Sequence, residues 1–274
     1  MKTKKPIFEE KTKLGKLGRH SSDWIVINNR KYLSVKTAEN TIKMFKVQKE
    51  NDSYSFKEDT KYSITLEETD NIMFSAFDRN FKHIMTLRNG NILERRAVNN
   101  KNNVIKSITL EEKVGGSTLR QLCLSNDGNF CMIAGGLCKA YSYFVDIENN
   151  KQTKLESGKL TGTFAPCFVN GEPKFAAVGS EEGIVEIWDV HKQELVKSIH
   201  NESKDSISCT TSVNNIMAVC SVDQTLRLYD VRNWEMFYSQ TFDMTPRSLH
   251  LTDDSKYVTI GGGGGEKCVV LQIQ

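Results

Sequence analysis

The sequence has few of the features that predict helices or membrane spans. No stretch approaches the roughly 18 uninterrupted apolar residues of a transmembrane helix, so we expect none. No long segment places apolar residues at the i, i+3, i+4, i+7 spacing of an amphipathic helix. The N-terminus is basic and lacks the apolar core of a secretory signal, so we expect no such signal. The hydrophobic fraction of 38% and the charged fraction of 26% are typical of a soluble globular protein.

Motifs for metal and redox chemistry are also missing. The 7 cysteines are an odd number at irregular spacing, and no pair forms a C-x-x-C motif, which argues against structural zinc and a thioredoxin-like redox pair. Several cysteines stand at apolar strand positions, where a free thiol packs as a small hydrophobe. We therefore expect a reducing compartment, the cytoplasm or alternatively the nucleus. The 5 histidines are scattered and form no metal-ligand spacing, so we expect no metal.

Catalytic signatures are equally scarce. No G-x-S-x-G is present. Gly261–Gly265 is followed by Glu266-Lys267-Cys268, whereas a phosphate-binding Walker A loop needs Lys-Ser/Thr opening a helix, so we expect a flexible turn. The acidic pairs Glu111-Glu112 and Glu181-Glu182 stand at strand ends or turns, which is typical of solvated faces, although folding can bring distant carboxylates together. We expect no enzyme, no cofactor and no small-molecule substrate.

An internal repeat is the strongest positive signal. Gly183–Val190 reads Gly-Ile-Val-Glu-Ile-Trp-Asp-Val, and Gln224–Val231 reads Gln-Thr-Leu-Arg-Leu-Tyr-Asp-Val. Their aspartates, Asp189 and Asp230, are 41 residues apart, and a weaker copy ends at Asp146, 43 residues before Asp189. A period of about 40 to 45 residues closing on Asp predicts the four-stranded blades of a β-propeller.

The repeat predicts an all-β chain of six blades. The best-defined blades span 163–200 and 207–242, and weaker copies span 118–147 and 71–110. The first blade, 23–67, is expected to carry a polar insertion over 48–60, and the last, 246–274, supplies only three strands. Seven blades stay an alternative, but at about 40 residues each they would need roughly 280 residues.

The two ends of the chain are predicted to share one blade. We expect residues 5–11 to supply the missing outer strand of the last blade, because pairing the open edges removes strands that would otherwise aggregate. Residues 1–21 then form a basic N-terminal segment that contributes the closing strand. Residues 22–274 form a single propeller domain.

The blades resemble WD40 repeats. Ser180–Val190 carries Trp188-Asp189, and Ser221–Val231 carries Tyr229-Asp230 in the corresponding place. We expect Trp188 and Tyr229 to pack between neighbouring blades, as the structural signature of the repeat. More narrowly, Phe242–Gly263 resembles the sixth-blade region of subunit i, the WD-repeat subunit of eukaryotic translation initiation factor 3. That resemblance implies docking onto other subunits and indirect work at the small ribosomal subunit.

Positive charge is concentrated at the N-terminus. Residues 1–20 hold Glu9 and Glu10 against seven basic residues: Lys2, Lys4, Lys5, Lys11, Lys13, Lys16 and Arg19. Such a segment could contact RNA or a protein partner, or it could simply be solvated. Arg95-Arg96 with Lys101 is predicted to form a second small basic patch.

We expect a non-catalytic scaffold that holds protein partners in a multi-subunit complex, because a rigid propeller offers many exposed loops. The alternative is an RNA- or ribosome-associated biogenesis factor that uses its basic tail. Neither reading involves a membrane.

Overall fold

The chain is nearly all-β. The computed structural model describes residues 3–4, 17–27, 30–37, 41–50, 53–65, 72–78, 80, 82–98, 103–114, 121–158, 160–200, 205–263 and 268–273. These residues form strands β1 to β25 and one short 3-10 helix, η1 (Val169–Gly171). Within these ranges no helix is long and apolar enough to span a membrane. The predicted all-β class is confirmed.

The chain divides into two compact units. The first comprises Met1–Ile7, Val114–Ser125 and Asn129–Gln274, and the second comprises Phe8–Lys113 and Asn126–Gly128. In the described residues the two units together hold six antiparallel sheets, five with four strands and one with five. The sheets are numbered 1 to 6 below in chain order. They are consistent with the blades of a WD40-type propeller; the number of blades and the closed ring stay predictions.

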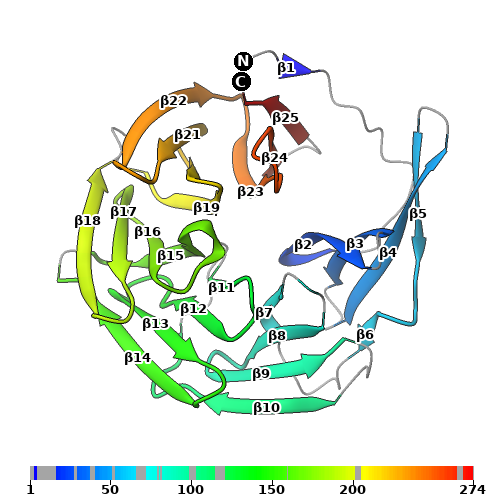
Figure 1. Ribbon diagram of the computed structural model, residues 1–274, viewed down its shortest axis with the longest axis horizontal. Helices are drawn as coiled ribbons and strands as arrows, with labels where there is room; N and C mark the ends of the chain where they lie inside the picture. The colour runs from blue at the N-terminus through cyan, green and yellow to red at the C-terminus, as the bar shows by residue number, and fades with distance from the viewer. Residues whose placement is uncertain are drawn as a thin grey trace. The chain divides into compact units, whose positions relative to one another are not determined.

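The first unit contains sheets 3 to 6 (Figure 1). Sheet 3 has strands β11 (Leu122–Leu124), β12 (Phe130–Ala134), β13 (Tyr141–Asp146) and β14 (Lys151–Glu156). Sheet 4 has strands β15 (Thr163–Phe168), β16 (Phe175–Ser180), β17 (Ile184–Asp189) and β18 (Glu194–His200). Sheet 5 has strands β19 (Ile207–Val213), β20 (Ile216–Ser221), β21 (Thr225–Asp230) and β22 (Glu235–Thr241). Sheet 6 has strands β23 (Thr245–Leu251), β24 (Tyr257–Gly263), β25 (Cys268–Gln272) and β1 (Thr3–Lys4).

Within the first unit the sheets stack through their first strands. Strand β15 contacts β11 on one side and β19 on the other, and β19 contacts β23. All six residues of β15 are therefore buried, whereas the first four of β18, at the other end of sheet 4, are exposed. A strand covered on both faces reads as a continuous apolar run rather than an alternating one.

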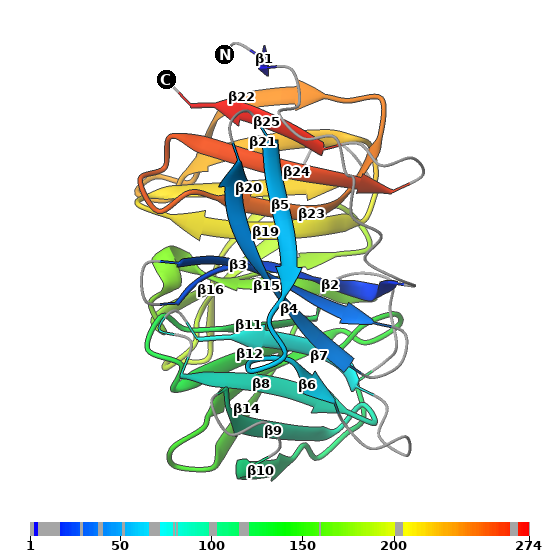
Figure 2. The same cartoon turned by 90° about the vertical axis from the view of Figure 1, so that its right-hand side faces the viewer.

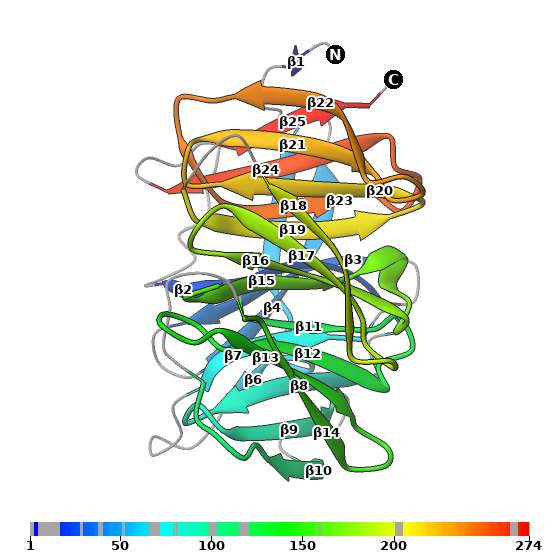
Figure 3. The same cartoon turned by 90° about the vertical axis from the view of Figure 1, so that its left-hand side faces the viewer.

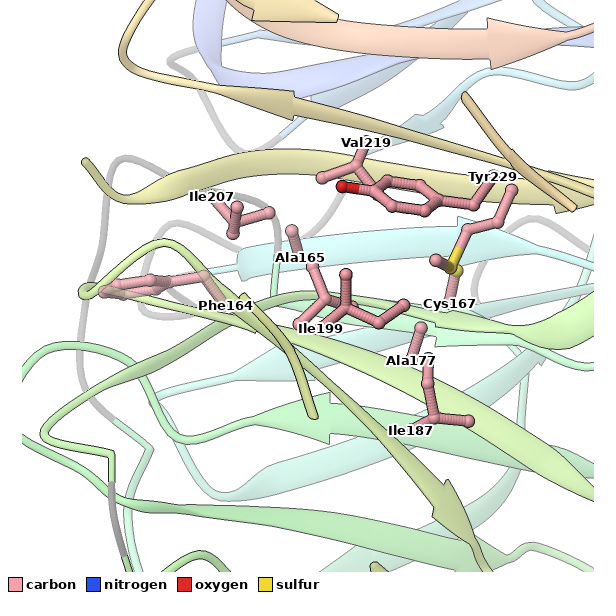
Figure 4. Close-up of a cluster of buried hydrophobic side chains, with 11 residues drawn as sticks. Phe164, Ala165, Cys167, Ala177, Ile187, Ile199, Ile207, Val219 and Tyr229 are labelled. Atoms are coloured by element: carbon pink, nitrogen blue, oxygen red, sulfur yellow. The ribbon is translucent and has the colours of Figure 1, made fainter. Parts of the chain in front are cut away.

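A buried cluster joins sheets 4 and 5 (Figure 4). Sheet 4 supplies Phe164 and Ile187, and sheet 5 supplies Ile207, Val219 and Tyr229. These side chains are nearly inaccessible to solvent. At roughly 25 cal/mol per Å² of apolar surface, burial of this kind is the main attraction between neighbouring sheets.

The second unit contains sheets 1 and 2. Sheet 2 has strands β7 (Ile72–Phe77), β8 (His83–Arg88), β9 (Ile92–Ala97) and β10 (Val104–Thr109). Sheet 1 has strands β2 (Leu17–Ile27), β3 (Arg30–Thr37), β4 (Thr41–Glu50), β5 (Ser53–Glu58) and β6 (Ile64–Thr65). Strand β2 contacts β7.

The predicted insertion over 48–60 contains a strand that was not predicted from the sequence. Strand β4 continues to Glu50 and pairs with β5 from Phe45↔Glu58 to Glu50↔Ser53, which makes a long hairpin (Figure 2). The short strand β6 pairs with the start of the same strand, at Thr41 and Ile42. In the segment 53–57, Tyr54 and Phe56 alternate with polar residues, which is the pattern of a strand. This signal was overlooked because the segment as a whole is polar.

An N-terminal strand does pair with the last sheet, but it is shorter and earlier than predicted. Strand β1 pairs antiparallel with β25 through Thr3↔Leu271 and Lys4↔Val270. Residues 5–11, which we expected in this place, lie outside the described residues. The pairing makes a strand from the start of the chain the fourth strand of sheet 6.

The first three residues of the glycine cluster lie in a strand rather than in the predicted turn. Gly261–Gly263 belong to β24, and residues 264–267 lie outside the described part of the chain. A Cβ atom on Gly261 would clash with Ser248 Oγ, and one on Gly262 would clash with Met244 Sδ. These two glycines therefore allow close packing within sheet 6.

Candidate interaction surface

Exposed apolar side chains gather on outer strands. In the described residues eight large hydrophobic residues are exposed, and six of them stand in adjacent pairs on β10, β18 and β22. These pairs are Val104 with Ile105, Leu195 with Val196, and Met236 with Phe237. Single exposed apolar residues are ordinary, but a recurrent pair at one position of a repeat points to a use.

Each pair marks a β-bulge. On β18, Leu195 pairs with Trp188 of β17 and Lys197 pairs with Ile187. Val196 is therefore an extra residue with no pairing partner on β17. The register of β22 against β21 and of β10 against β9 shifts in the same way. The extra residues, Ile105, Val196 and Phe237, are between 49% and 51% exposed. Bulges interrupt the pleat and redirect side chains.

The bulge accompanies a large side chain on the preceding strand. The partner of the first apolar residue is Trp188 in sheet 4, Tyr229 in sheet 5 and Arg96 in sheet 2. In sheet 3 the equivalent residue is Val145, and there β13 and β14 pair in continuous register. Sequence reasoning missed these bulges, although in sheets 4 and 5 the size of the residue before the repeat aspartate was a usable signal.

The aromatic signature residues are buried in the interior. Trp188 packs in a cluster with Phe168 and Phe144, and Tyr229 packs in the cluster that joins sheets 4 and 5. The Trp188 indole Nε1–H donates to Glu186 Oε2 at 3.1 Å, and the Ser157 hydroxyl donates to Glu186 Oε1 at 2.7 Å. The carboxylate of Glu186 thus links sheet 3 to sheet 4 in a site that is only 2% exposed.

The two signature aspartates close turns. Asp189 Oδ1 accepts the backbone N–H of Lys192, and Asp230 Oδ1 accepts the backbone N–H of Arg232. The Arg232 guanidinium also bonds to the Asp230 carboxylate, and these hydrogen bonds lower the Asp230 pKa to about 2. Asp and Asn side chains commonly satisfy turn backbone in this way.

The predicted basic N-terminal segment is described only in part. Lys4 lies in β1 and Arg19 in β2, whereas Lys2, Lys5, Lys11, Lys13 and Lys16 lie outside the described residues. The proposed contact with RNA or a partner therefore stays a prediction.

The prediction of a second basic patch at Arg95 and Arg96 is wrong. Arg95 and Arg96 are buried rather than exposed. Arg96 pairs with Glu94 Oε2 at 2.6 Å, and Arg95 lies 3.1 Å from Nδ1 of His83. Each of the two residues is covered because β9 is the third strand of its sheet, with all four central side chains buried. Lys101 lies outside the described residues.

The Glu181-Glu182 pair holds a neighbouring loop. The Thr161 hydroxyl contacts both carboxylates, and the Thr161 backbone N–H donates to Glu182 Oε1 at 2.8 Å. Burial raises the Glu182 pKa, but the hydrogen bonds from Thr161 outweigh it and leave the pKa below its ordinary value. Both carboxylates are thus engaged in a turn contact.

The cysteines behave as packing groups. Among the described residues Cys123, Cys131, Cys167, Cys209 and Cys220 are buried free thiols, and Cys138 is exposed. Burial raises the pKa of Cys131 and of Cys220 well above the ordinary value, which keeps both in the unreactive thiol form. In the same part of the chain no group of three metal-binding side chains is assembled.

Comparison with known proteins supports the WD-repeat resemblance at the level of the repeat. No protein-family model matches the chain. The chain is similar to WD repeat-containing protein 70 of Xenopus laevis, with 29% identity over 107 residues. The match covers 33% of this chain and 16% of that protein, so the chain spans only a small part of its relative. The comparison lends no support to the narrower resemblance to subunit i of initiation factor 3.

Proposed function

We propose that the protein is a non-catalytic WD40-type scaffold that binds other proteins within a multi-subunit complex. The observation that supports this most is the repeated apolar pair at the outer-strand bulges of sheets 2, 4 and 5. Exposing these side chains costs free energy unless a partner covers them. The WD-repeat relative is the second support.

The rigid construction of the first unit fits this role. Its sheets are joined by apolar clusters and by buried polar links such as Ser157–Glu186. A stiff frame loses little conformational freedom on binding, so it can present several surfaces at low entropic cost. Activity then depends on surface chemistry rather than on movement of the frame.

Affinity purification tests the scaffold directly. The tagged full chain is recovered from its own cells, and the co-purifying proteins are identified by mass spectrometry at two salt concentrations. A reproducible set that survives moderate salt supports a scaffold. If the chain elutes alone at both salt concentrations, the scaffold proposal is rejected.

The identity of the complex is a separate part of the proposal. The resemblance of Phe242–Gly263 to a subunit of translation initiation factor 3 predicts recovery of other subunits of that factor, in the cytoplasm. A clean set of unrelated partners rejects that assignment and leaves the scaffold in place.

An RNA- or ribosome-associated role through the basic N-terminus is the alternative. Deleting residues 1–20 removes seven basic residues and two glutamates. The alternative predicts RNA binding by the full chain that weakens with salt and is lost on deletion. The deletion also removes β1 and the first four residues of β2. Replacing Lys11, Lys13 and Lys16 with Gln is therefore the matched variant that leaves both strands in place.

A further inference from the structure

Strand β22 differs in charge from the other outer strands of the first unit. It begins with Glu235, and the rest of the strand, from Met236 to Thr241, reads Met-Phe-Tyr-Ser-Gln-Thr and carries no charge. Strand β14 carries Lys151 and Lys154, and β18 carries Lys197. Charged side chains on an edge strand, lysine above all, discourage pairing with another chain. Strand β22 has no lysine, and its one charged residue, Glu235, stands at its first position.

The backbone of β22 is available on one side. The order of sheet 5 is β19-β20-β21-β22, so β22 pairs with β21 on one side and is the last strand of its sheet (Figure 3). The described residues place no strand against its other side. Backbone N–H and C=O groups along such an edge can pair with an added strand, whereas the backbone groups along the middle of a helix are already paired within it.

The charge beside the apolar pair indicates what the added strand carries. Glu235 stands opposite Asp230 in the register of β21 and β22. Arg232 pairs with Asp230 at 2.5 Å. Glu235 bonds only to Asn233, with Nδ2 donating to Oε2 at 2.9 Å, and has no cation partner among the described residues. A basic side chain on a partner would complement it.

We infer that β22 binds an extended segment of a partner protein, which adds to sheet 5 as a fifth strand. The segment places uncharged apolar side chains against Met236 and Phe237 and a lysine or arginine near Glu235. This inference rests on the proposed scaffold function and names the surface and the partner chemistry. The backbone pairing supplies affinity, and the apolar pair with Glu235 supplies selectivity.

The experiment compares three full-length forms: the native chain, Phe237→Lys and Leu137→Lys. Leu137 is a matched control because it is 53% exposed, close to the 51% of Phe237, but stands in the turn between β12 and β13. Each form is purified from cells with its partners, and its thermal unfolding is measured first. Phe237→Leu is added as a conservative variant that should keep binding.

The expected result is loss of one partner with Phe237→Lys and its retention with Leu137→Lys and Phe237→Leu. The partner's Kd for the Phe237→Lys variant is about tenfold or more above its Kd for the native chain, as expected for a residue at the centre of an interface. Hydrogen exchange of the purified complex then shows slowed amides over 235–241 and over a partner segment with alternating apolar residues and one basic residue.

The other outcomes are distinguishable. If the native chain recovers no partner, the proposed function fails and the docking strand with it. If all forms recover the same partners, the scaffold stands and the β22 site is rejected. Protection outside 235–241, a helical partner segment, or recovery of a second copy of this chain as the partner also overturns the inference.

Discussion

Asn170 and Asn215 join neighbouring sheets across 45 residues of sequence. The side-chain Oδ1 of Asn170 accepts the backbone N–H of Asn215 at 2.9 Å. Asn170 has a φ of 57° and Asn215 a φ of 66°, both in the left-handed region that asparagine tolerates better than most residues. The backbone N–H of Asn170 also donates to Ser212 Oγ at 3.1 Å. The turn after β15 is thus tied to the turn after β19.

Two substitutions of Asn170 should separate the contribution of its side-chain hydrogen bond from that of its left-handed backbone. Asn170→Gly keeps the left-handed backbone and removes the side-chain acceptor, so we expect a loss of about 1 kcal/mol in the free energy of unfolding. Asn170→Ala removes the same acceptor and adds a left-handed penalty of roughly 1 kcal/mol. Urea unfolding measures both. Equal losses in the two variants would show that backbone conformation contributes nothing here.

Gly179 sets the distance between sheets 4 and 5. A Cβ atom at this position would lie 2.5 Å from Cβ and Cγ2 of Ile207, a fully buried residue. Gly179→Ala should therefore force β16 away from β19 and lower the free energy of unfolding by about 1–3 kcal/mol.

Gly158→Ala is the control for this experiment, because nothing lies within 4 Å of the corresponding Cβ position. We expect its effect to stay within about 0.5 kcal/mol. Thermal and urea unfolding compare the two variants. Similar stabilities for both would mean that the sheets can separate at this point without cost.

Glu186 should be a strong determinant of stability despite its charge. Glu186→Ala leaves the Ser157 hydroxyl and the Trp188 indole N–H without their acceptor and opens a cavity, so we expect a loss of about 3 kcal/mol. Glu186→Gln keeps the shape and one acceptor, so its loss should be smaller. The exposed Glu194→Ala is the control, with an effect within about 0.5 kcal/mol.

A double-mutant cycle tests the link itself. We expect Glu186→Ala and Ser157→Ala to show a coupling energy of about 1 kcal/mol or more, since the two side chains share a hydrogen bond of 2.7 Å. Additive losses would mean that the contact does not join the sheets energetically.

The low pKa of Asp230 should make the stability of the folded protein depend on pH. Its pKa in the folded protein, about 2, lies below the ordinary value because of the hydrogen bonds from Arg232. A depressed carboxyl pKa stabilises the folded state above the unfolded-state pKa of about 3.9 and loses this effect as pH falls toward 2.

Arg232→Gln should therefore raise the Asp230 pKa toward its ordinary value, as measured by NMR titration of the carboxyl carbon. The difference in melting temperature between this variant and the native chain should shrink as pH falls from 5 to 2. Arg247→Gln, at another exposed arginine, is the control and should leave the Asp230 titration unchanged. An unaltered pKa in Arg232→Gln would show that another group lowers it.

The sequence predicted much of sheets 4 and 5. The predicted strand Ile184–Val190 corresponds to β17 (Ile184–Asp189), and Thr225–Val231 corresponds to β21 (Thr225–Asp230). Turn residues and alternating apolar runs act locally, so they can be read from the chain. The hairpin of β4 and β5 was missed because long-range pairing of a polar strand leaves a weaker local signal.

The functional surface was less predictable. Arg95 and Arg96 looked like a basic patch in the sequence, yet both are buried among side chains of their own sheet. Conversely, Met236 and Phe237 read as ordinary strand residues, and only the register of β22 against β21 shows that the bulge exposes them. Charge and hydrophobicity are properties of residues, but exposure is a property of packing.

The period of the repeat and its turns indicated, without any structure, that this chain forms antiparallel sheets, most of them with four strands. Tertiary structure alone decided which apolar residues are exposed to solvent, which charged side chains are buried, and which N-terminal residues pair with β25. The physical reason is that strand formation depends on neighbours in sequence, whereas burial and edge pairing depend on neighbours in space.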